Sequence, residues 1–275
     1  AFENAVVQDG LISVLRHGFK HRGINFRVCY FKPESELNEL AVANYQKNVC
    51  HCIRQWHYSE QNKNSIDMML AVNGIPVVAV ELKNQLTGQS VDDAMRQWAY
   101  NRNPKEPAFG FNKRVLAYFA CDLYNVYMTT RLEGATTRFL PFNQGSNGAG
   151  NDGGAGNPQN ASDSYVTSYF WEAVLQKDSL MDILQKFISF EKTEKKETMP
   201  DGSTNKKVES KIIFPRYHQL DVVRKLVDHA RETGSGHNYL IQHSAGSGKS
   251  NSIAWTAYRM ASLHDSNSEA IFNSV

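Results

Sequence analysis

Two acidic residues and a lysine stand at the ends of the most strand-like part of the chain, NSIDMMLAVNGIPVVAVELKNQ (64–85). They are Asp67, Glu81 and Lys83. Two neighbouring carboxylates repel each other and become stable together when a divalent cation lies between them, and such oxygen ligands suit Mg²⁺. A nearby ammonium can orient an attacking water and offset charge on a phosphate. These residue types therefore indicate metal-assisted phosphodiester hydrolysis, and the alternative is a pair of solvated strand ends with a local ion pair.

The elements that would position these side chains are a hairpin and the helix after it. Asn73-Gly74 lies between two apolar runs and is a strong hairpin signal, because both residues tolerate positive φ. The runs predict strands at 66–72 and 75–84. Ser90 is a suitable N-cap for the segment VDDAMRQWAYNR, which predicts a helix directly after the second strand.

The pairing register of this hairpin decides whether the acids meet. A simple two-residue turn pairs Asp67 with Val80 and puts the two carboxylates on opposite faces, because side chains alternate along a strand. One extra residue near Pro76, which cannot donate to the ladder, pairs Asp67 with Glu81 instead. Lys83 then lies on their face. The sequence permits both registers.

With these residues the chain resembles the PD-(D/E)xK nuclease core. More narrowly, IDMMLAVNGIPVVAVELKN and the upstream ANYQKNVCHCIRQWHYS are similar to the nuclease domain of the R (motor and restriction) subunit of type I restriction enzymes. The resemblance implies that Asp67 and Glu81 bind the metal and act in catalysis together with Lys83. It also implies DNA contacts from the following helix, by Gln97, Tyr100 and Arg102.

A second block of chemistry-bearing residues follows in NYLIQHSAGSGKSNSIAWTAYRMASLH (238–264), which predicts a strand, a loop and a helix. Its centre matches a phosphate-binding loop, although His243 stands where the first glycine is usual. The glycines let backbone N–H groups point at phosphates, Lys249 reaches the terminal phosphates, and Ser250 helps to hold Mg²⁺. A coincidental glycine loop is the alternative. The predicted nucleotide-binding residues here are Gly246, Ser247, Gly248, Lys249 and Ser250.

The segment FPRYHQLDVV, upstream of this loop, resembles the adenine-recognition element of superfamily 2 helicases. By that resemblance Gln219 reads the base edge, and the alternative is a helix start with Tyr217 and Leu220 in the core. The resemblance to the R subunit thus covers about residues 25–130 and 212–275, in the order nuclease and then motor.

Composition supports a division of the chain. We expect an α/β fold: a PD-(D/E)xK nuclease domain, with a mixed sheet flanked by helices, at 1–165, then a helical segment and connector at 166–211. The start of a RecA-like P-loop helicase domain follows at 212–275. Residues 143–164 are almost wholly Gly, Asn, Ser, Ala and Asp and predict a long mobile loop. Apolar residues at helical spacing predict a helix at 168–190.

The bulk numbers are those of an ordinary globular protein, with 41% hydrophobic and 21% charged residues among 275. A net charge of +2 gives no argument of its own for nucleic acid. No apolar run is long enough for a membrane span, and no secretory signal is visible. Four cysteines fit a reducing cytoplasm. The missing initial Met predicts a piece of a longer chain.

One possible metal site is rejected. Cys50-His51-Cys52 with His57 has no second ligand pair at zinc spacing, and we place these residues on a helix through 41–56.

Three functions remain open. The resemblance implies an ATP-driven, DNA-translocating endonuclease that uses Mg²⁺ and ATP, acts on double-stranded DNA and works with methyltransferase and specificity subunits, without a membrane. The second function is a nuclease–helicase of recombination or repair without methyltransferase partners. The third is an NTPase whose N-terminal domain binds DNA or partners but is not catalytic.

Overall fold

The computed structural model describes residues 1–35, 37–159, 165–198, 204–265, 267 and 269–275. The chain contains both helices and strands, and short 3₁₀ or π-helical turns are marked η. In chain order the elements are α1 (Phe2–Asp9), α2 (Leu11–His17), β1 (Phe19–His21), β2 (Ile24–Phe26), α3 (Glu39–Gln46), β3 (Cys50–His57), β4 (Ser65–Val72), β5 (Ile75–Leu82), η1 (Gln85–Thr87), α4 (Val91–Arg96), η2 (Gln97–Asn101), η3 (Pro107–Phe109), β6 (Ala117–Cys121), β7 (Val126–Thr129), β8 (Leu140–Pro141), η4 (Phe170–Val174), α5 (Lys177–Asp182), η5 (Ile183–Phe187), β9 (Ser189–Thr198), β10 (Thr204–Ile213), α6 (Tyr217–Thr233) and α7 (Lys249–Met260).

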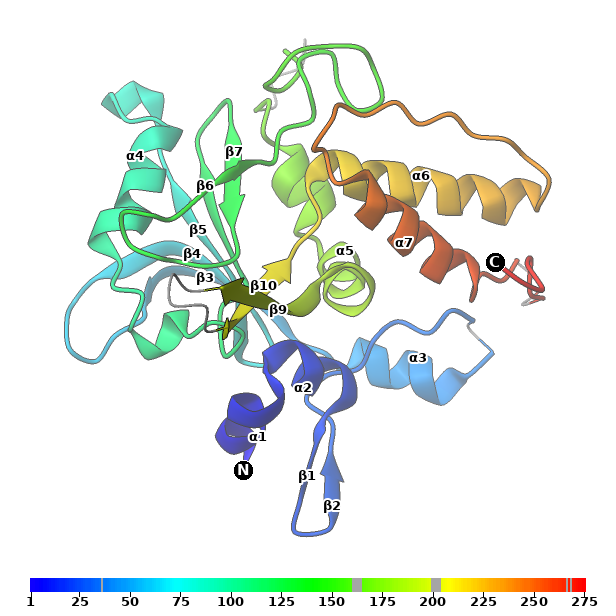
Figure 1. Cartoon of the computed structure of the whole chain (residues 1–275), viewed down its shortest axis with the longest axis horizontal. Coiled ribbons are helices and arrows are strands. Elements are labelled where there is room, and N and C mark those ends of the chain that lie inside the picture. Colours follow the sequence, from blue (N-terminus) through cyan, green and yellow to red (C-terminus); the bar gives the residue numbers. More distant parts are fainter. Residues whose placement is uncertain (36, 160–164, 199–203, 266, 268) are drawn as a thin grey trace.

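The centre of the molecule is a six-stranded sheet with the order β3-β4-β5-β6-β7-β8. Strands β5 and β6 run parallel, and the other neighbours are antiparallel. The chain between β5 and β6 contains α4, as a parallel connection requires. This mixed sheet flanked by helices confirms the expected α/β class (Figure 1).

The two faces of the sheet are covered differently. One face packs against α4 and η2, where Ala94 and the fully buried Trp98 contact a cluster that includes Ala79 and Tyr118. The other face packs against helices from both ends of the chain. The buried residues of that larger core include Val6, Leu15, Val78, Phe119, Phe170, Phe187, Val223, Val227 and Trp255.

The predicted helix at 41–56 is wrong in its second half. Helix α3 ends at Gln46, and the buried Asn48 turns the chain by donating to the backbone oxygens of Tyr30 and Tyr45. Residues 50–57 then pair with β4 as the edge strand β3. Cys50 and Cys52 are exposed on this strand. Pairing with the next strand, β4, outweighs the local helical pattern here.

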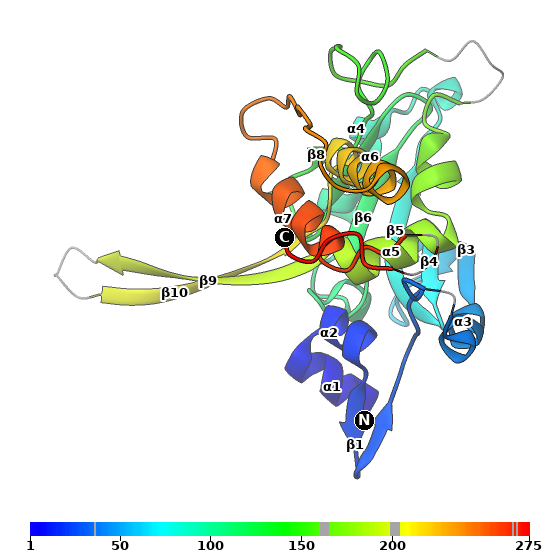
Figure 2. The same cartoon turned by 90° about the vertical axis from the view of Figure 1, so that its right-hand side faces the viewer.

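The charged segment at 191–211, predicted as a connector, forms most of an antiparallel hairpin. Strands β9 and β10 pair from Ser189–Ile213 to Thr198–Thr204. At the base of the hairpin, Lys211 and Glu191 form an ion pair at 3.0 Å. Figure 2 shows the two strands projecting from the body of the molecule. Cross-strand pairs of opposite charge support such a ribbon in water.

The helical prediction for 168–190 is confirmed up to Phe187, as three consecutive helical pieces, η4, α5 and η5. The predicted mobile loop at 143–164 lies partly outside the described residues. Its described part is irregular and closed by hydrogen bonds, such as Gly145 N to Gly156 O at 2.8 Å. Among the described helices, none combines the length and the apolar character that crossing a bilayer requires.

The strand predicted before the glycine loop does not form. Residues 238–244 are assigned to no strand, and Leu240 is 95% exposed. Tyr239 and Ile241 instead line an apolar cavity of about 740 Å³, with Met260 of α7 on its far side. A strand needs hydrogen-bonding neighbours, and no described strand lies beside this segment.

The hairpin turn requires a left-handed backbone at Gly74. This residue has a φ of +82°, and an added Cβ there would meet no atom of another residue within 4 Å. The variant Gly74→Ala should therefore add only the backbone strain of a Cβ-bearing residue at positive φ, at a cost of about 1–2 kcal/mol of unfolding free energy. Gly74→Asn should lose less, because Asn tolerates this conformation. Urea unfolding measures both, and an unchanged stability of Gly74→Ala would contradict the turn.

Candidate nuclease and phosphate-loop sites

The register of the β4–β5 hairpin brings the two acids together. The turn is a two-residue one, with Asn73 at φ +50° and Gly74 at φ +82°. The pairing then shifts between Leu70 and Ala71, which pair with Val78 and Pro76. One residue of β5 is therefore extra, and the Met68–Val80 pair places Asp67 opposite Glu81. The shared-face register is confirmed.

Asp67 is held through both of its carboxylate oxygens. The backbone N–H of Leu82 donates to Oδ2 at 2.8 Å, and Nε2 of Gln55 donates to Oδ1 at 3.1 Å. Gln55 is held in turn, because Oγ of Ser65 donates to its Oε1 at 2.7 Å. The sequence patterns did not indicate Gln55, which falls in the predicted helix at 41–56, or Ser65, which lies just before the predicted strand at 66–72.

Glu81 is fully buried beside Asp67. Arg102 donates to its Oε1 from Nε at 2.9 Å and from Nη2 at 2.5 Å. The other oxygen, Oε2, is buried, and no residue in the described part of the chain donates a hydrogen bond to it. Burial raises the pKa of Glu81 to about 7, and Asp67 acts in the same direction while Arg102 opposes both. Arg102 thus contacts the carboxyl group at Oε1 and leaves Oε2 without a donor among the described residues.

Lys83 completes the cluster from the end of β5. Its backbone N–H donates to Cys121 O at 2.9 Å, and its Nζ donates to Oε1 of Gln97 at 2.6 Å. Gln97 belongs to η2, on the face of the sheet that carries Asp67 and Glu81. The structure therefore brings four of the predicted site residues together: Asp67, Glu81, Lys83 and Gln97.

The other two predicted DNA contacts lie differently. Tyr100 is 68% exposed and available to a ligand. Arg102 is only 5% exposed, and its guanidinium is engaged by Glu81 and by the carbonyl of Ser65 at 2.7 Å. In this arrangement Arg102 does not reach solvent. The predicted DNA contact of Arg102 is therefore replaced by a contact inside the site.

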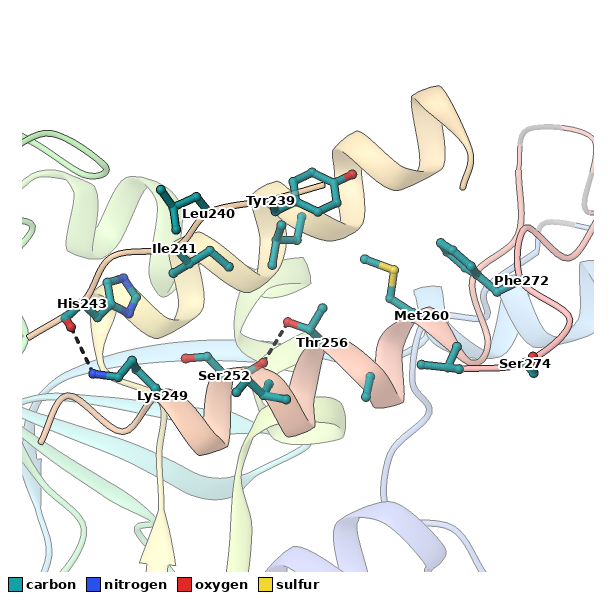
Figure 3. Close-up of a pocket in the computed structure, with 14 residues that line it drawn as sticks. Tyr239, Leu240, Ile241, His243, Lys249, Ser252, Thr256, Met260, Phe272 and Ser274 are labelled. Carbon is teal, nitrogen blue, oxygen red and sulfur yellow. Dashed lines mark hydrogen bonds between the residues drawn. The ribbon is translucent and has the colours of Figure 1, made fainter. Parts of the chain in front are cut away.

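The glycine loop precedes α7 as predicted. Gly246 and Gly248 have φ values of +72° and +82°, which glycine adopts without strain. Lys249, the first residue of α7, folds back so that its Nζ donates to the carbonyls of His243 and Ser244, both at 3.1 Å. Figure 3 shows this side chain reaching His243. Ser250 is exposed on the first turn of the helix.

The start of α6 packs directly on this loop. Gln219 is 3% exposed, accepts from the backbone N–H of Arg216 and donates to Gly248 O, each at 2.9 Å. A Cβ on Gly248 would lie 2.4 Å from Nε2 of Gln219, so this position requires glycine. Gln219 thus supports the loop, and its base-reading role stays a prediction.

Comparison with known protein families shows which family the first part of the chain is related to. Residues 28–137 match the family described as type I restriction enzyme R protein N terminus. Residues 28–137 belong to this family. No curated protein matches the chain.

The part of the chain in the type I R protein family carries the whole carboxylate cluster. It runs from before β3 to beyond β7 and includes Asp67, Glu81 and Lys83. The predicted resemblance over residues 25–130 is thereby confirmed. The glycine loop lies outside the matched residues, so its resemblance to a helicase motor stays a prediction.

The cluster within the type I R protein region fits a hard divalent cation. Asp67 and Glu81 face each other, and the buried, unpartnered Oε2 of Glu81 is an oxygen that a cation would satisfy. Among the described residues, no group of three or more His, Cys, Asp and Glu side chains is placed to hold a metal. Mg²⁺ can bind with only two protein carboxylates, because it retains several waters as its other ligands.

The glycine loop has the features of a phosphate-binding site. It combines left-handed glycines, a helix N-terminus and the ammonium of Lys249. The hydroxyl of Ser247 is buried in the loop and has no hydrogen-bond partner among the described residues. A cavity of about 440 Å³ borders the loop and is lined on its other sides by Gln219, Arg216 and residues of β7 and β10.

Proposed function

We propose that this chain carries the nuclease site and the nucleotide-binding loop of a type I restriction enzyme R subunit. The nuclease site cleaves phosphodiester bonds of double-stranded DNA with Mg²⁺, and the loop binds ATP to drive translocation. The observation that carries the proposal is the Asp67–Glu81 pair on one face of the sheet, within residues that belong to the R protein family.

Each residue of the nuclease site has a separate role. Asp67, held by Leu82 N–H and Gln55, presents a fixed carboxylate, and Glu81 presents Oε2. Bound Mg²⁺ would supply positive charge at the scissile phosphate and lower the pKa of a water. Lys83 orients the attacking water and offsets charge on the phosphate. Gln97 holds the Lys83 ammonium through Oε1.

The glycine loop supplies the second activity. Lys249 is held by loop carbonyls that it can exchange for phosphate oxygens, because both contacts are single hydrogen bonds at an exposed side chain. Ser250 would hold the Mg²⁺ of the nucleotide. Residues 212–275 are accordingly the start of a RecA-like helicase domain, and residues 1–165 a PD-(D/E)xK domain.

The family relationship favours methyltransferase and specificity subunits as partners over a recombination or repair nuclease that acts without them. A non-catalytic N-terminal domain fits less well, because solvated strand ends would not leave Glu81 fully buried with an unpartnered oxygen. Gln97 and Tyr100 are the proposed DNA contacts. A cytoplasmic location stays a prediction.

Metal binding tests the nuclease site directly. The nucleotide-free chain should bind Mn²⁺, used as a probe for Mg²⁺, and Asp67→Asn should weaken this binding by at least about tenfold. The reason is that loss of one of two carboxylates removes a favourable charge contact worth more than about 1.4 kcal/mol. Electron paramagnetic resonance of free Mn²⁺ measures the affinity.

The matched control is Asp9→Asn. This variant changes an exposed carboxylate on α1, which is separated from Asp67 by more than fifty residues of sequence. It should bind Mn²⁺ as the wild type does. Equal binding by wild type and Asp67→Asn would remove the metal site, and with it the proposed nuclease activity.

A further inference from the structure

Arg102 follows an unusual turn of the helix that covers the nuclease site. After α4 the helix widens into the π-helical turn η2, and Arg102 itself is extended, with φ −114° and ψ 114°. In a regular α-helix, residues five apart point about 140° away from each other. The wider turn lets Gln97 and Arg102 reach the same site, where they contact Lys83 and Glu81.

The guanidinium of Arg102 is held from three sides. It donates twice to Glu81, once to the carbonyl of Ser65, and lies over the ring of Tyr58 with 5.4 Å between its central carbon and the ring centroid. A planar guanidinium held in this way has little freedom to move. Its position is therefore set by the fold rather than by Glu81 alone.

The two hydrogen bonds from Arg102 to Glu81 end on the same carboxylate oxygen. Oε1 of Glu81 receives the two bonds, and Oε2 receives none from the residues that the structure describes. The contact therefore does not close the site, because it leaves free the oxygen that a cation would need. A guanidinium blocking the site would instead bond to both oxygens in a fork.

A continuous set of hydrogen bonds joins the two carboxylates. Ser65 accepts from Arg102 through its carbonyl, and its hydroxyl donates to Gln55, whose Nε2 donates to Asp67. Gln55 has a φ of +50°, a conformation that residues other than glycine seldom adopt and that tends to persist at functional sites. Arg102 and Gln55 thus hold Glu81 and Asp67 in one arrangement.

We propose that Arg102 is a positioning residue, which holds Oε1 of Glu81 so that Oε2 is the oxygen offered to the divalent cation. This inference rests on the proposed function of the site. The opposite interpretation is that the ion pair competes with the cation and must break before it binds. The two interpretations predict opposite effects of weakening the contact.

The test uses the whole chain without nucleotide and Mn²⁺ as the probe. Arg102→Lys keeps the positive charge but cannot place two fixed donors on one oxygen. We expect Mn²⁺ binding to weaken by about 10- to 100-fold, the usual effect of removing a residue that orients a metal ligand. Arg96→Lys, an exposed position on α4, is the control and should bind Mn²⁺ as the wild type does.

A second variant keeps the test valid if Arg102→Lys does not fold. Tyr58→Leu removes the ring under the guanidinium but leaves the ion pair in place, and should weaken Mn²⁺ binding by a smaller factor. Thermal unfolding without metal, measured on the same samples, separates loss of affinity from loss of fold. Unchanged or tighter Mn²⁺ binding in the folded variants overturns the positioning role.

The result also distinguishes this inference from the proposed function. If wild type binds Mn²⁺ and Asp67→Asn does not, while the Arg102 and Tyr58 variants bind normally, only the role of Arg102 is wrong. If the wild type does not bind Mn²⁺, or Asp67→Asn binds it equally well, both the nuclease site and the role of Arg102 are wrong.

Discussion

Replacing Lys83 by alanine should slow DNA cleavage by about 10²–10³-fold, the usual effect of removing one group that stabilises charge in a transition state. The Nζ of Lys83 donates to Gln97 at 2.6 Å on the face that carries both carboxylates. Its removal leaves the metal ligands and their hydrogen bonds in place. Cleavage is measured with the partner subunits present, on DNA that carries the recognition site.

ATP hydrolysis and translocation should persist in the Lys83→Ala protein, because the side chain of Lys83 contacts Gln97, whereas that of Lys249 contacts His243 and Ser244. Lys20→Ala is the control, since Lys20 is exposed on β1. Full cleavage by Lys83→Ala would exclude a catalytic role for this lysine. Loss of both activities, with normal Mn²⁺ binding, would show that the two sites depend on each other.

Replacing Lys249 by alanine should abolish ATP-driven translocation. A charge contact between an ammonium and a phosphate near a protein surface is worth up to about 4 kcal/mol, which is close to 10³-fold in nucleotide affinity. Lys249 is exposed, and within the described residues its ammonium donates to the carbonyls of His243 and Ser244 alone, so the fold should not change. Binding of a fluorescent ATP analogue and a translocation assay measure the two effects.

The control for this experiment is Lys225→Ala, on the neighbouring helix α6. Its side chain is 59% exposed and pairs with Asp221, a surface contact that contributes at most about 1 kcal/mol. This variant should bind nucleotide normally. Wild-type translocation by Lys249→Ala would remove the motor assignment, whereas its Mn²⁺ binding should equal that of the wild type in every case.

Local chemistry in the sequence was enough to predict several elements. Asn73-Gly74 can adopt positive φ at both positions, and the strands on either side form within two residues of the predicted bounds. The helix after Ser90 forms as well, and Asp93 accepts from the backbone N–H of Ser90 at 2.9 Å. Turns and caps depend on residues close together in the chain, so their signals survive in any fold.

Strands were predicted poorly where they depend on a pairing partner outside their own residues. Residues 50–57 read as a helix but pair with β4, and the segments 191–198 and 204–211 read as a connector but pair with each other. Residues 239–241 are apolar and strand-like, yet no described strand pairs with them. Strand formation requires a neighbour, and the sequence of a segment does not contain its neighbour.

The residues able to do chemistry could be identified without a structure: two acids, a lysine and a glycine loop with its own lysine. The position of Asp67 opposite Glu81 became known from the fold, because register depends on one extra residue in β5. It also turned Arg102 from a predicted DNA contact into the partner of Glu81. Packing between different segments sets how deeply a side chain is buried, which face of the sheet it lies on and what it bonds to. Local sequence patterns do not carry that information.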